Sequence, residues 1–245
     1  MPDRFVVGVP LGRWQTNCWL IGDHDRGSCA VIDPGEGGAE AVPVLLARLG
    51  VACEAILVTH GHLDHFWSVP ALADALDVPI HAHPGDRWLW ENPVAGFGNV
   101  PEGALEQMFG LRWTNPVDRL VDVADGDRIE VAGISYAVQH NPGHTPGHVT
   151  FLGAGLGRVP VEFAMGSHHQ VPGDGVLFSG DLVFEGSIGR TDFPNGSMDQ
   201  MWASLERTVL PLQDDTLILS GHGPDTTVGR ERRANPFLAQ LVRRG

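Results

Sequence analysis

The chain has 245 residues, of which 42% are hydrophobic, so it is long and apolar enough to form a globular core. Its 30 acidic residues outnumber its 16 basic residues, and the formal net charge of −14 disfavours binding to nucleic acid or to anionic membranes. Because no apolar run approaches the roughly 18 residues of a membrane span and the N-terminus lacks the apolar core of a signal peptide, we expect a cytoplasmic protein.

Short strands separated by turns occupy the first third of the chain. In chain order, the hydrophobic pattern predicts strands at 5–9, 17–21 and 29–32, a helix over 39–49, a strand at 55–58, a helix over 66–76 and a strand at 77–82. The segment that follows, residues 92–117, is rich in Gly, Pro and Asn. We expect it to form a long, partly irregular excursion.

Strands and turns return in the second half, and helices close the chain. The pattern predicts strands at 119–123, 128–131, 135–139, 149–152 and 176–178, a helix over 197–210, a strand at 216–219 and a last helix over 229–244. Residues 153–175 are rich in Gly and are expected to form an extended surface loop. Many short strands, a few helices and no long linker predict one α/β domain over residues 1–245, compatible with two stacked sheets and outer helices.

Four metal-capable side chains lie within six residues of the segment Thr-His-Gly-His-Leu-Asp-His at 59–65. This segment lies between the predicted strand at 55–58 and the helix after it, which is the usual place for a site on an α/β scaffold. Three imidazoles and a carboxylate are preferred ligands of zinc and iron. The sequence therefore predicts a transition-metal site that includes His60, His62, Asp64 and His65.

Four further segments place a metal-capable residue beside Gly or Pro just after a predicted strand. These residues are Asp33 in Asp-Pro-Gly, His144 in Pro-Gly-His-Thr-Pro-Gly-His, Asp181 in Ser-Gly-Asp and His222 in Ser-Gly-His-Gly-Pro. Each alone is typical of a turn or a helix cap. Together with residues 60–65 they form a coherent set of strand-end groups, and the neighbouring glycines let a metal or substrate approach the backbone.

The order of these motifs, HxHxDH, GHTPGH, SGD and GHG, resembles the metallo-β-lactamase superfamily over nearly the whole chain. Within that superfamily, residues 186–194 and 221–229 are similar to the small bacterial glyoxalase II-like proteins, the hydroxyacylglutathione hydrolases. The resemblance implies a four-layer αββα sandwich with its site at one edge of the two sheets.

The same resemblance implies a role for each motif residue and two divalent metal ions, with zinc favoured and iron as the alternative. The first metal would be held by His60, His62 and His144, the second by Asp64, His65 and His222, with Asp181 as the bridge between them. Asp64 would also be catalytic, because it would orient the activated water. Two cations that share a water lower its pKa from 15.7 towards about 7 and polarise a thioester carbonyl. Asp33 would steady the site without binding metal.

Other residues near the motifs have two interpretations or a structural one. We expect His148, outside the family's ligand pattern, to be structural. Arg190 either forms a buried ion pair with Asp192 or faces a pocket and binds an anionic substrate such as a carboxylate-bearing thiol conjugate. The tryptophans that either pack in the core or line a pocket are Trp67, Trp88, Trp90 and Trp113. We expect His168 and His169 to be solvated loop residues.

A metal-dependent hydrolase that splits an S-(2-hydroxyacyl) thioester into a 2-hydroxy acid and a thiol is the function that the resemblance favours. Larger glyoxalase II enzymes hold glutathione with basic groups in a C-terminal region, whereas only 23 residues follow His222 in this 245-residue chain. The sequence therefore leaves the identity of the substrate's thiol open. The alternatives are a persulfide dioxygenase, with one iron on His60, His144 and Asp181, and a lactonase. In each case the expected partner is a small molecule rather than nucleic acid or a membrane.

Overall fold

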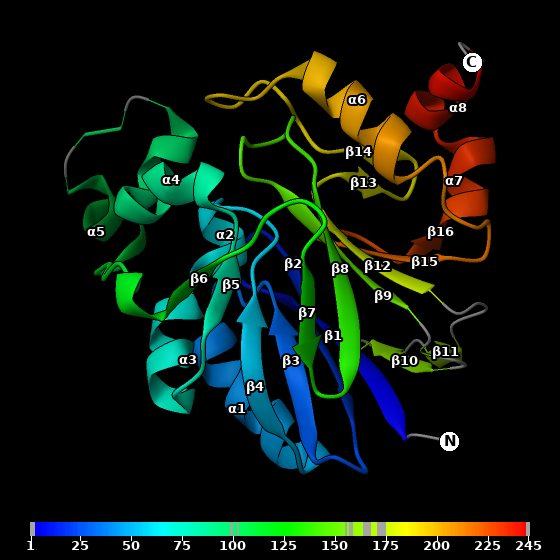
Figure 1. Cartoon of the computed structure of the whole chain (residues 1–245). Coiled ribbons are helices and arrows are strands. Elements are labelled where there is room, and N and C mark those ends of the chain that lie inside the picture. The colour runs from blue at the N-terminus through cyan, green and yellow to red at the C-terminus, as the bar shows by residue number, and fades with distance from the viewer. Residues whose placement is uncertain are drawn as a thin grey trace.

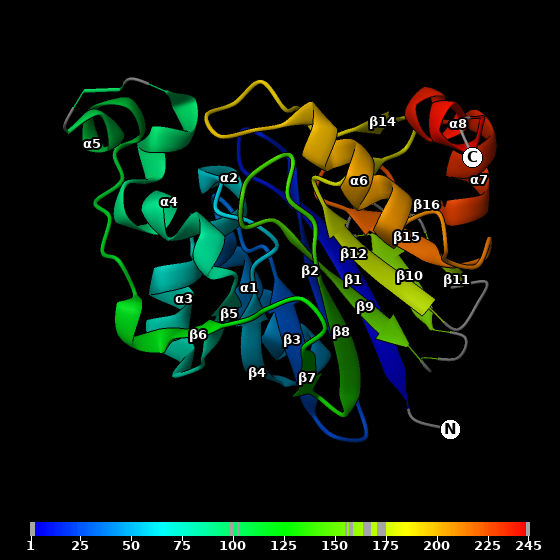
Figure 2. The same ribbon diagram turned by 45° about the horizontal axis from the view of Figure 1, so that its top comes forward.

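Two β-sheets packed face to face, with helices on both outer sides, form the architecture of the chain (Figures 1 and 2). The structure is a computed structural model, and it describes residues 3–98, 100–101, 103–154, 156, 159–163, 168–170 and 175–243. This arrangement confirms the predicted four-layer αββα sandwich. Within the described residues, no helix combines the length and the apolar character needed to cross a membrane.

The first sheet combines a long antiparallel hairpin with a parallel region. Across the sheet its strands are β11 (His168–Gln170), β10 (Pro160–Phe163), β1 (Arg4–Leu11), β2 (Thr16–Asp23), β3 (Ser28–Ile32), β4 (Ala52–Leu57), β5 (Ile80–Ala82) and β6 (Leu120–Asp122). Strands β3 to β6 are parallel. Parallel strands need crossover connections, and α1 (Gly38–Leu49) and α3 (Val69–Leu76) supply the first two of them.

The second sheet is mostly antiparallel. Across it the strands are β16 (Thr226–Thr227), β15 (Leu217–Ser220), β12 (Gly175–Gly180), β9 (Val149–Ala154), β8 (Ile134–His140) and β7 (Arg128–Val131). Its parallel pair, β12 and β15, is connected through α6 (Met198–Thr208). The remaining elements are α2 (Leu63–Phe66), η1 (Pro84–Asp86), α4 (Arg87–Glu91), η2 (Pro93–Phe97), α5 (Ala104–Phe109), η3 (Val117–Arg119), β13 (Val183–Phe184), β14 (Ser187–Ile188), α7 (Val228–Ala234) and α8 (Pro236–Val242).

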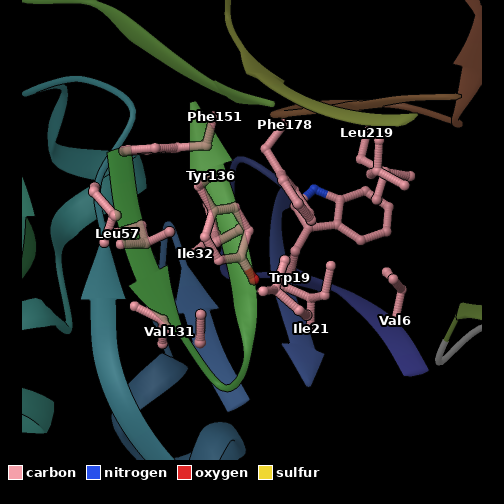
Figure 3. Close-up of a cluster of buried hydrophobic side chains, with 14 of the residues drawn as sticks. Val6, Trp19, Ile21, Ile32, Leu57, Val131, Tyr136, Phe151, Phe178 and Leu219 are labelled. Carbon is pink, nitrogen blue, oxygen red and sulfur yellow. The ribbon is translucent and has the colours of Figure 1, made fainter. Parts of the chain in front are cut away.

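Three apolar clusters hold the layers together. Figure 3 shows the central cluster, in which Trp19 and Ile21 of the first sheet meet Tyr136 and Phe178 of the second. A second cluster joins the other face of the first sheet to α1 and α3, and a third joins the second sheet to α6 and α8. Burial of each large apolar side chain stabilises the fold by roughly 1.5–3 kcal/mol. Alternate residues of β2 reach different clusters, because side chains alternate across a strand.

Three predicted elements differ from the structure. The helix predicted over 66–76 is divided into α2 and α3, because Pro70 lacks a backbone N–H and starts a new helix. The last helix, predicted over 229–244, is likewise divided into α7 and α8, since Asn235 and Pro236 end one helix and cap the next. The excursion predicted at 92–117 contains the short helices η2 and α5.

The prediction of one extended surface loop at 153–175 was wrong. Its described part contains β10 and β11, and β10 pairs in parallel with β1 to extend the first sheet. The loop prediction failed because the surrounding glycines hid two short strands that depend on long-range pairing, β10 with the N-terminal strand β1 and β11 with β10. His168 and His169 are therefore strand residues, and their side chains lie outside the described part of the chain.

Candidate metal centre

The segment after β4 is fixed to the neighbouring strand by one buried carboxylate. Asp33 follows β3 and accepts hydrogen bonds from the backbone N–H of Thr59 (2.8 Å) and from its hydroxyl group (2.6 Å). A third bond, of 2.9 Å, joins Asp33 Oδ2 to His65 Nδ1. Because Asp33 points its oxygens at these donors, it supports the segment instead of facing the centre, as the sequence predicted.

His60, His62 and His144 come together and are called the first group. Their candidate ligand atoms all lie within 4.8 Å of one another, and His62 Nδ1 is 2.8 Å from His144 Nε2. The Nδ1 atom of His144 donates a hydrogen bond to the backbone oxygen of Arg190, at 2.6 Å. Since an imidazole that donates from Nδ1 keeps a lone pair on Nε2, this bond prepares His144 as a ligand.

The hydroxyl group of Thr59 prepares His60 in the same way. That hydroxyl donates its one proton to Asp33, so it can only accept from His60 Nδ1, which lies 3.1 Å away. The lone pair of His60 is therefore on Nε2, a buried atom without a hydrogen-bond partner. A buried nitrogen lone pair without a donor is costly unless it meets a cation.

Asp64, His65 and His222 come together as the second group, again with candidate ligand atoms within 4.8 Å of one another. His222 Nε2 lies 3.2 Å from Asp64 Oδ2, and His65 Nε2 lies 3.5 Å from the same oxygen. The hydroxyl of Thr16 donates to Asp64 Oδ2 at 2.9 Å. A β-bridge between Thr16 and His222 also ties the first sheet to the loop after β15.

Asp181 lies between the two groups. Its Oδ1 atom is 3.3 Å from His65 Nε2, and its Oδ2 atom is 3.4 Å from His144 Nε2 and 3.8 Å from His222 Nε2. The backbone N–H of Asp181 donates to Nε2 of His148 at 3.1 Å. His148 thus orients Asp181 and lies outside both groups, which agrees with the structural role expected for it.

Burial and neighbouring charges set the protonation of these side chains. Burial, reinforced by the other imidazoles, holds the pKa of His60 well below its usual value and lowers that of His62 to about 3. Burial alone would raise the pKa of Asp64, but the charge of His65 and the hydrogen bond of His222 outweigh it and lower that pKa to about 2. Neutral imidazoles and ionised carboxylates are the forms that bind metal, so His60, His62 and Asp64 are ready to bind. Against the effect of burial, the charges of Asp64 and Asp181 raise the pKa of His65 well above its usual value, so a metal there has to displace its proton.

Unpartnered atoms at the centre test whether these residues fit a metal. The buried Nε2 atoms of His60, His62 and His65 and the Oδ1 atom of Asp181 have no hydrogen-bond partner. Gly221 leaves the space that they need, since a Cβ atom there would lie 2.4 Å from Asp181 Oδ1. Nitrogen and oxygen atoms that carry lone pairs and have no hydrogen-bond partner fit transition-metal ions as ligands.

Asp86 is a site residue that the sequence did not reveal. Its carboxylate accepts bonds from the N–H of Gly61 (2.8 Å), the hydroxyl of Thr145 (2.6 Å) and the N–H of Gly147 (2.7 Å). Burial raises its pKa in spite of these bonds. Asp86 therefore joins the loop that carries His60 and His62 to the loop that carries His144. Its three partners are 25 to 61 residues away, and Pro-Gly-Asp alone is typical of a turn.

A cavity of about 430 Å³ opens beside both groups. The side chains that line it, apart from the candidate ligands, include Trp14, Phe97, Phe184, Ile188, Arg190 and Phe193. None of the four tryptophans considered from the sequence is part of this lining. Trp90 is buried in the core, and Trp113 packs against the same cluster. Trp14 was missed because it lies in the short turn between β1 and β2 and not beside a motif.

Arg190 combines parts of its two sequence interpretations. It forms an ion pair with Asp192, with nitrogen–oxygen distances of 2.9 and 2.8 Å, and it lines the cavity. The pair is not buried as one interpretation required, because the two side chains are 65% and 68% exposed. The loop around it is held instead through the backbone oxygen of Arg190, which accepts from His144.

Comparisons with known proteins agree with this geometry. The family model of the metallo-beta-lactamase superfamily matches residues 11–159 and 155–222. The hydroxyacylglutathione hydrolase GloC of Haemophilus influenzae is 36% identical, and the match covers 94% of this chain and 96% of that protein. The crystal structure of BLEG-1 B3 metallo-beta-lactamase is 32% identical, with a TM-score of 0.76, and the match covers 96% of this chain and 99% of that one.

The crystal structure of TTHA1623 in a di-iron-bound form is 35% identical, with a TM-score of 0.71 and a match that covers 94% of this chain and 99% of that one. The family model, the relatives and the αββα sandwich agree with the resemblance seen in the sequence motifs. The chain belongs to the metallo-β-lactamase superfamily of metal-dependent hydrolases.

Proposed function

We propose that this protein hydrolyses a thioester of a 2-hydroxy acid, using two divalent metal ions. The observation that carries the proposal is the position of Asp181 between the first and the second group. A site for one metal needs only one of these groups, whereas here each group brings three candidate ligand atoms within 4.8 Å of one another. The similarity to the hydroxyacylglutathione hydrolase GloC over nearly the whole chain supports the thioester as the bond that is cleaved.

The first metal would be held by the first group, the second by the second group, and Asp181 would reach both. Ions bound there supply Lewis acidity, which polarises a carbonyl and lowers the pKa of water. Histidine-rich ligand sets with carboxylates suit zinc, and also iron, the metal in the related di-iron structure. The reaction adds water across the C–S bond, so a thioester gives a carboxylic acid and a free thiol.

The side chains of this site have defined tasks in that reaction. Asp33, Thr59 and the backbone oxygen of Arg190 fix the imidazole rings, so that little reorganisation is needed when substrate binds. Asp64 is positioned by Thr16 at the edge of the cavity, where its carboxylate can orient water. The apolar lining excludes bulk water and holds the rest of the substrate.

Metal analysis combined with hydrolysis of S-lactoyl thioesters tests the proposal. We expect two metal ions per chain, thioester cleavage that chelation abolishes, and recovery when zinc or iron is restored. A protein with one iron that consumes oxygen with a persulfide would contradict the proposal and support the dioxygenase alternative.

Hydrolysis of a β-lactam is the second candidate function, because BLEG-1 B3 metallo-beta-lactamase is similar over 96% of this chain. A β-lactam cleaved faster than every thioester would establish it.

A further inference from the structure

Aromatic rings surround the candidate ligands on the cavity side. The ring of Phe193 lies 5.1 Å from that of His62, and the ring of Phe184 lies 6.0 Å from that of His222. Farther out, Trp14 and Phe97 stack on each other, with ring centroids 6.3 Å apart and planes inclined by 21°. Phe97 is 44% exposed. These rings come from four separate segments, so the apolar wall is a feature of the whole cavity.

Arg190 is, among the described residues, the single positively charged side chain in the cavity lining apart from the candidate histidine ligands. One edge of its guanidinium forms a bidentate pair with Asp192, through Nε to Oδ1 and through Nη2 to Oδ2. The guanidinium also lies over the ring of Phe193, 4.4 Å from its centroid. Arg190 is therefore held as a flat, charge-neutralised platform and not as a free cation.

Arg13, next to Trp14, repeats this arrangement. Its Nε and Nη2 atoms donate to the carboxylate of Glu36 at 2.6 to 3.0 Å. Its guanidinium lies 5.5 Å from the ring centroid of Trp14 and 5.2 Å from that of Phe109. The two arginines beside the aromatic wall are thus both paired with carboxylates of this chain. The remaining charge of the protein, −14 in total, repels anions.

We infer that the thiol half of the substrate carries no net negative charge and binds against Trp14, Phe97 and Phe193. This inference rests on the thioester hydrolase proposed above. Glutathione carries carboxylates, which unpaired cations would attract, and here Asp192 and Glu36 already neutralise the charges of the two arginines. An uncharged thiol needs no cation to balance it, and it gains contact with the aromatic rings. Arg190, which the sequence suggested as a contact for an anionic substrate, instead contributes a flat surface.

Two S-lactoyl thioesters with the same acyl group and different thiols test the inference on the metal-loaded protein. We expect kcat/KM for the uncharged N-acetylcysteamine ester to exceed that for the glutathione ester by about tenfold or more. Calorimetry with the corresponding S-alkyl thioethers, which cannot be hydrolysed, should show the same order of affinity. Equal or better use of the glutathione compounds would overturn the inference. Tighter binding of the uncharged thioether without cleavage of either ester would support this inference and contradict the proposed reaction.

Variants of Asp192 and Trp14 test whether these residues determine which thiol is accepted. Asp192→Asn frees the fork of Arg190 and should shift the kcat/KM ratio towards the glutathione ester by about fivefold or more. Asp74→Asn is the control for the loss of a surface carboxylate, because it removes one of the two carboxylate partners of Arg119 outside the cavity. Trp14→Ala should raise KM for the uncharged ester by about five- to tenfold, and Trp14→Phe should restore most of the loss. An unchanged ratio in Asp192→Asn would contradict the inference.

Discussion

The first group and the second group of candidate ligands differ in charge and in access to solvent. The first consists of three imidazoles, and burial holds the pKa values of His60 and His62 below their usual range. The second contains the carboxylate of Asp64, and its His222 side chain is 30% exposed at the edge of the cavity. A metal in the first group would depend on fixed neutral rings, whereas one in the second would depend on charge. We therefore expect the second metal to exchange faster.

Asp181→Ala should have the largest effect, because the carboxylate of Asp181 lies between His144 of the first group and His65 and His222 of the second. Loss of a residue that hydrogen-bonds to a metal ligand lowers metal affinity or activity by about 10–100-fold. Removal of a ligand shared by both metals should therefore lower hydrolysis by more than about 100-fold. Metal analysis should show that both sites lose occupancy. The control is Asp74→Ala, at an exposed ion pair outside the cavity. Retention of two metals per chain would exclude Asp181 as the bridge.

Asp64→Ala should remove the second metal and leave the first, since Asp64 contacts His222, His65 and Thr16 and not the first group. We expect one metal per chain to remain, hydrolysis to fall by about 100-fold or more, and circular dichroism to stay unchanged. The mirror variant, His62→Ala, should weaken the first site instead. Turnover close to that of the wild type in Asp64→Ala would contradict the two-metal mechanism.

Asp86→Asn should affect the first group more than the second, because Asp86 bonds Gly61, between His60 and His62, and the loop of His144. An amide replaces one acceptor oxygen with a donor, so at least one buried donor of Gly61, Thr145 or Gly147 loses its partner. We expect stability to fall by about 1–3 kcal/mol and hydrolysis by about 10–100-fold. Metal titration followed by thermal unfolding measures both effects. Loss of the second metal instead of the first would show that Asp86 acts by another route.

The fold could be predicted where local pattern and long-range pairing agree. The apolar runs in β2 and β4 are visible in the sequence, and both strands form within a few residues of the predicted ends. Strands β10 and β11 were missed, because β10 depends on pairing with β1 and β11 on pairing with β10, while the glycines around these short segments indicate a loop. Proline marked the divided helices, but the sequence does not show that a second helix begins at once on the other side.

The candidate ligands could be predicted because their residue types and spacings are unusual, whereas the groups that hold them are ordinary. Nothing in the sequence of Asp86 or Thr16 distinguishes it from a turn or strand residue, and each acts on a loop far away in the chain. The cavity wall was missed for the same reason. Trp14 and Phe193 come from loops 179 residues apart, and only the folded chain brings them to one cavity.

Two threonines, one beside each group, offer the finest comparison. Thr59 bridges Asp33 and His60, while Thr16 donates only to Asp64, and both side chains are buried. Valine has nearly the same shape as threonine, so Thr59→Val and Thr16→Val remove the hydroxyl without a cavity. Thr59→Val leaves the His60 N–H without a partner and removes one of the two side-chain bonds to Asp33 Oδ2, which keeps His65. We expect hydrolysis to fall by up to about 100-fold.

Thr16→Val should be milder, because Asp64 Oδ2 keeps His222 and His65 nearby and the edge of the cavity admits water. We expect about a tenfold loss of hydrolysis, with metal lost from the second site only. Metal content per chain, measured after timed exposure to a weak chelator, distinguishes the two variants: Thr59→Val should accelerate release of the first metal and Thr16→Val release of the second. If both variants released the same metal first, the two groups would not be independent sites, and the division by charge and burial would have to be abandoned.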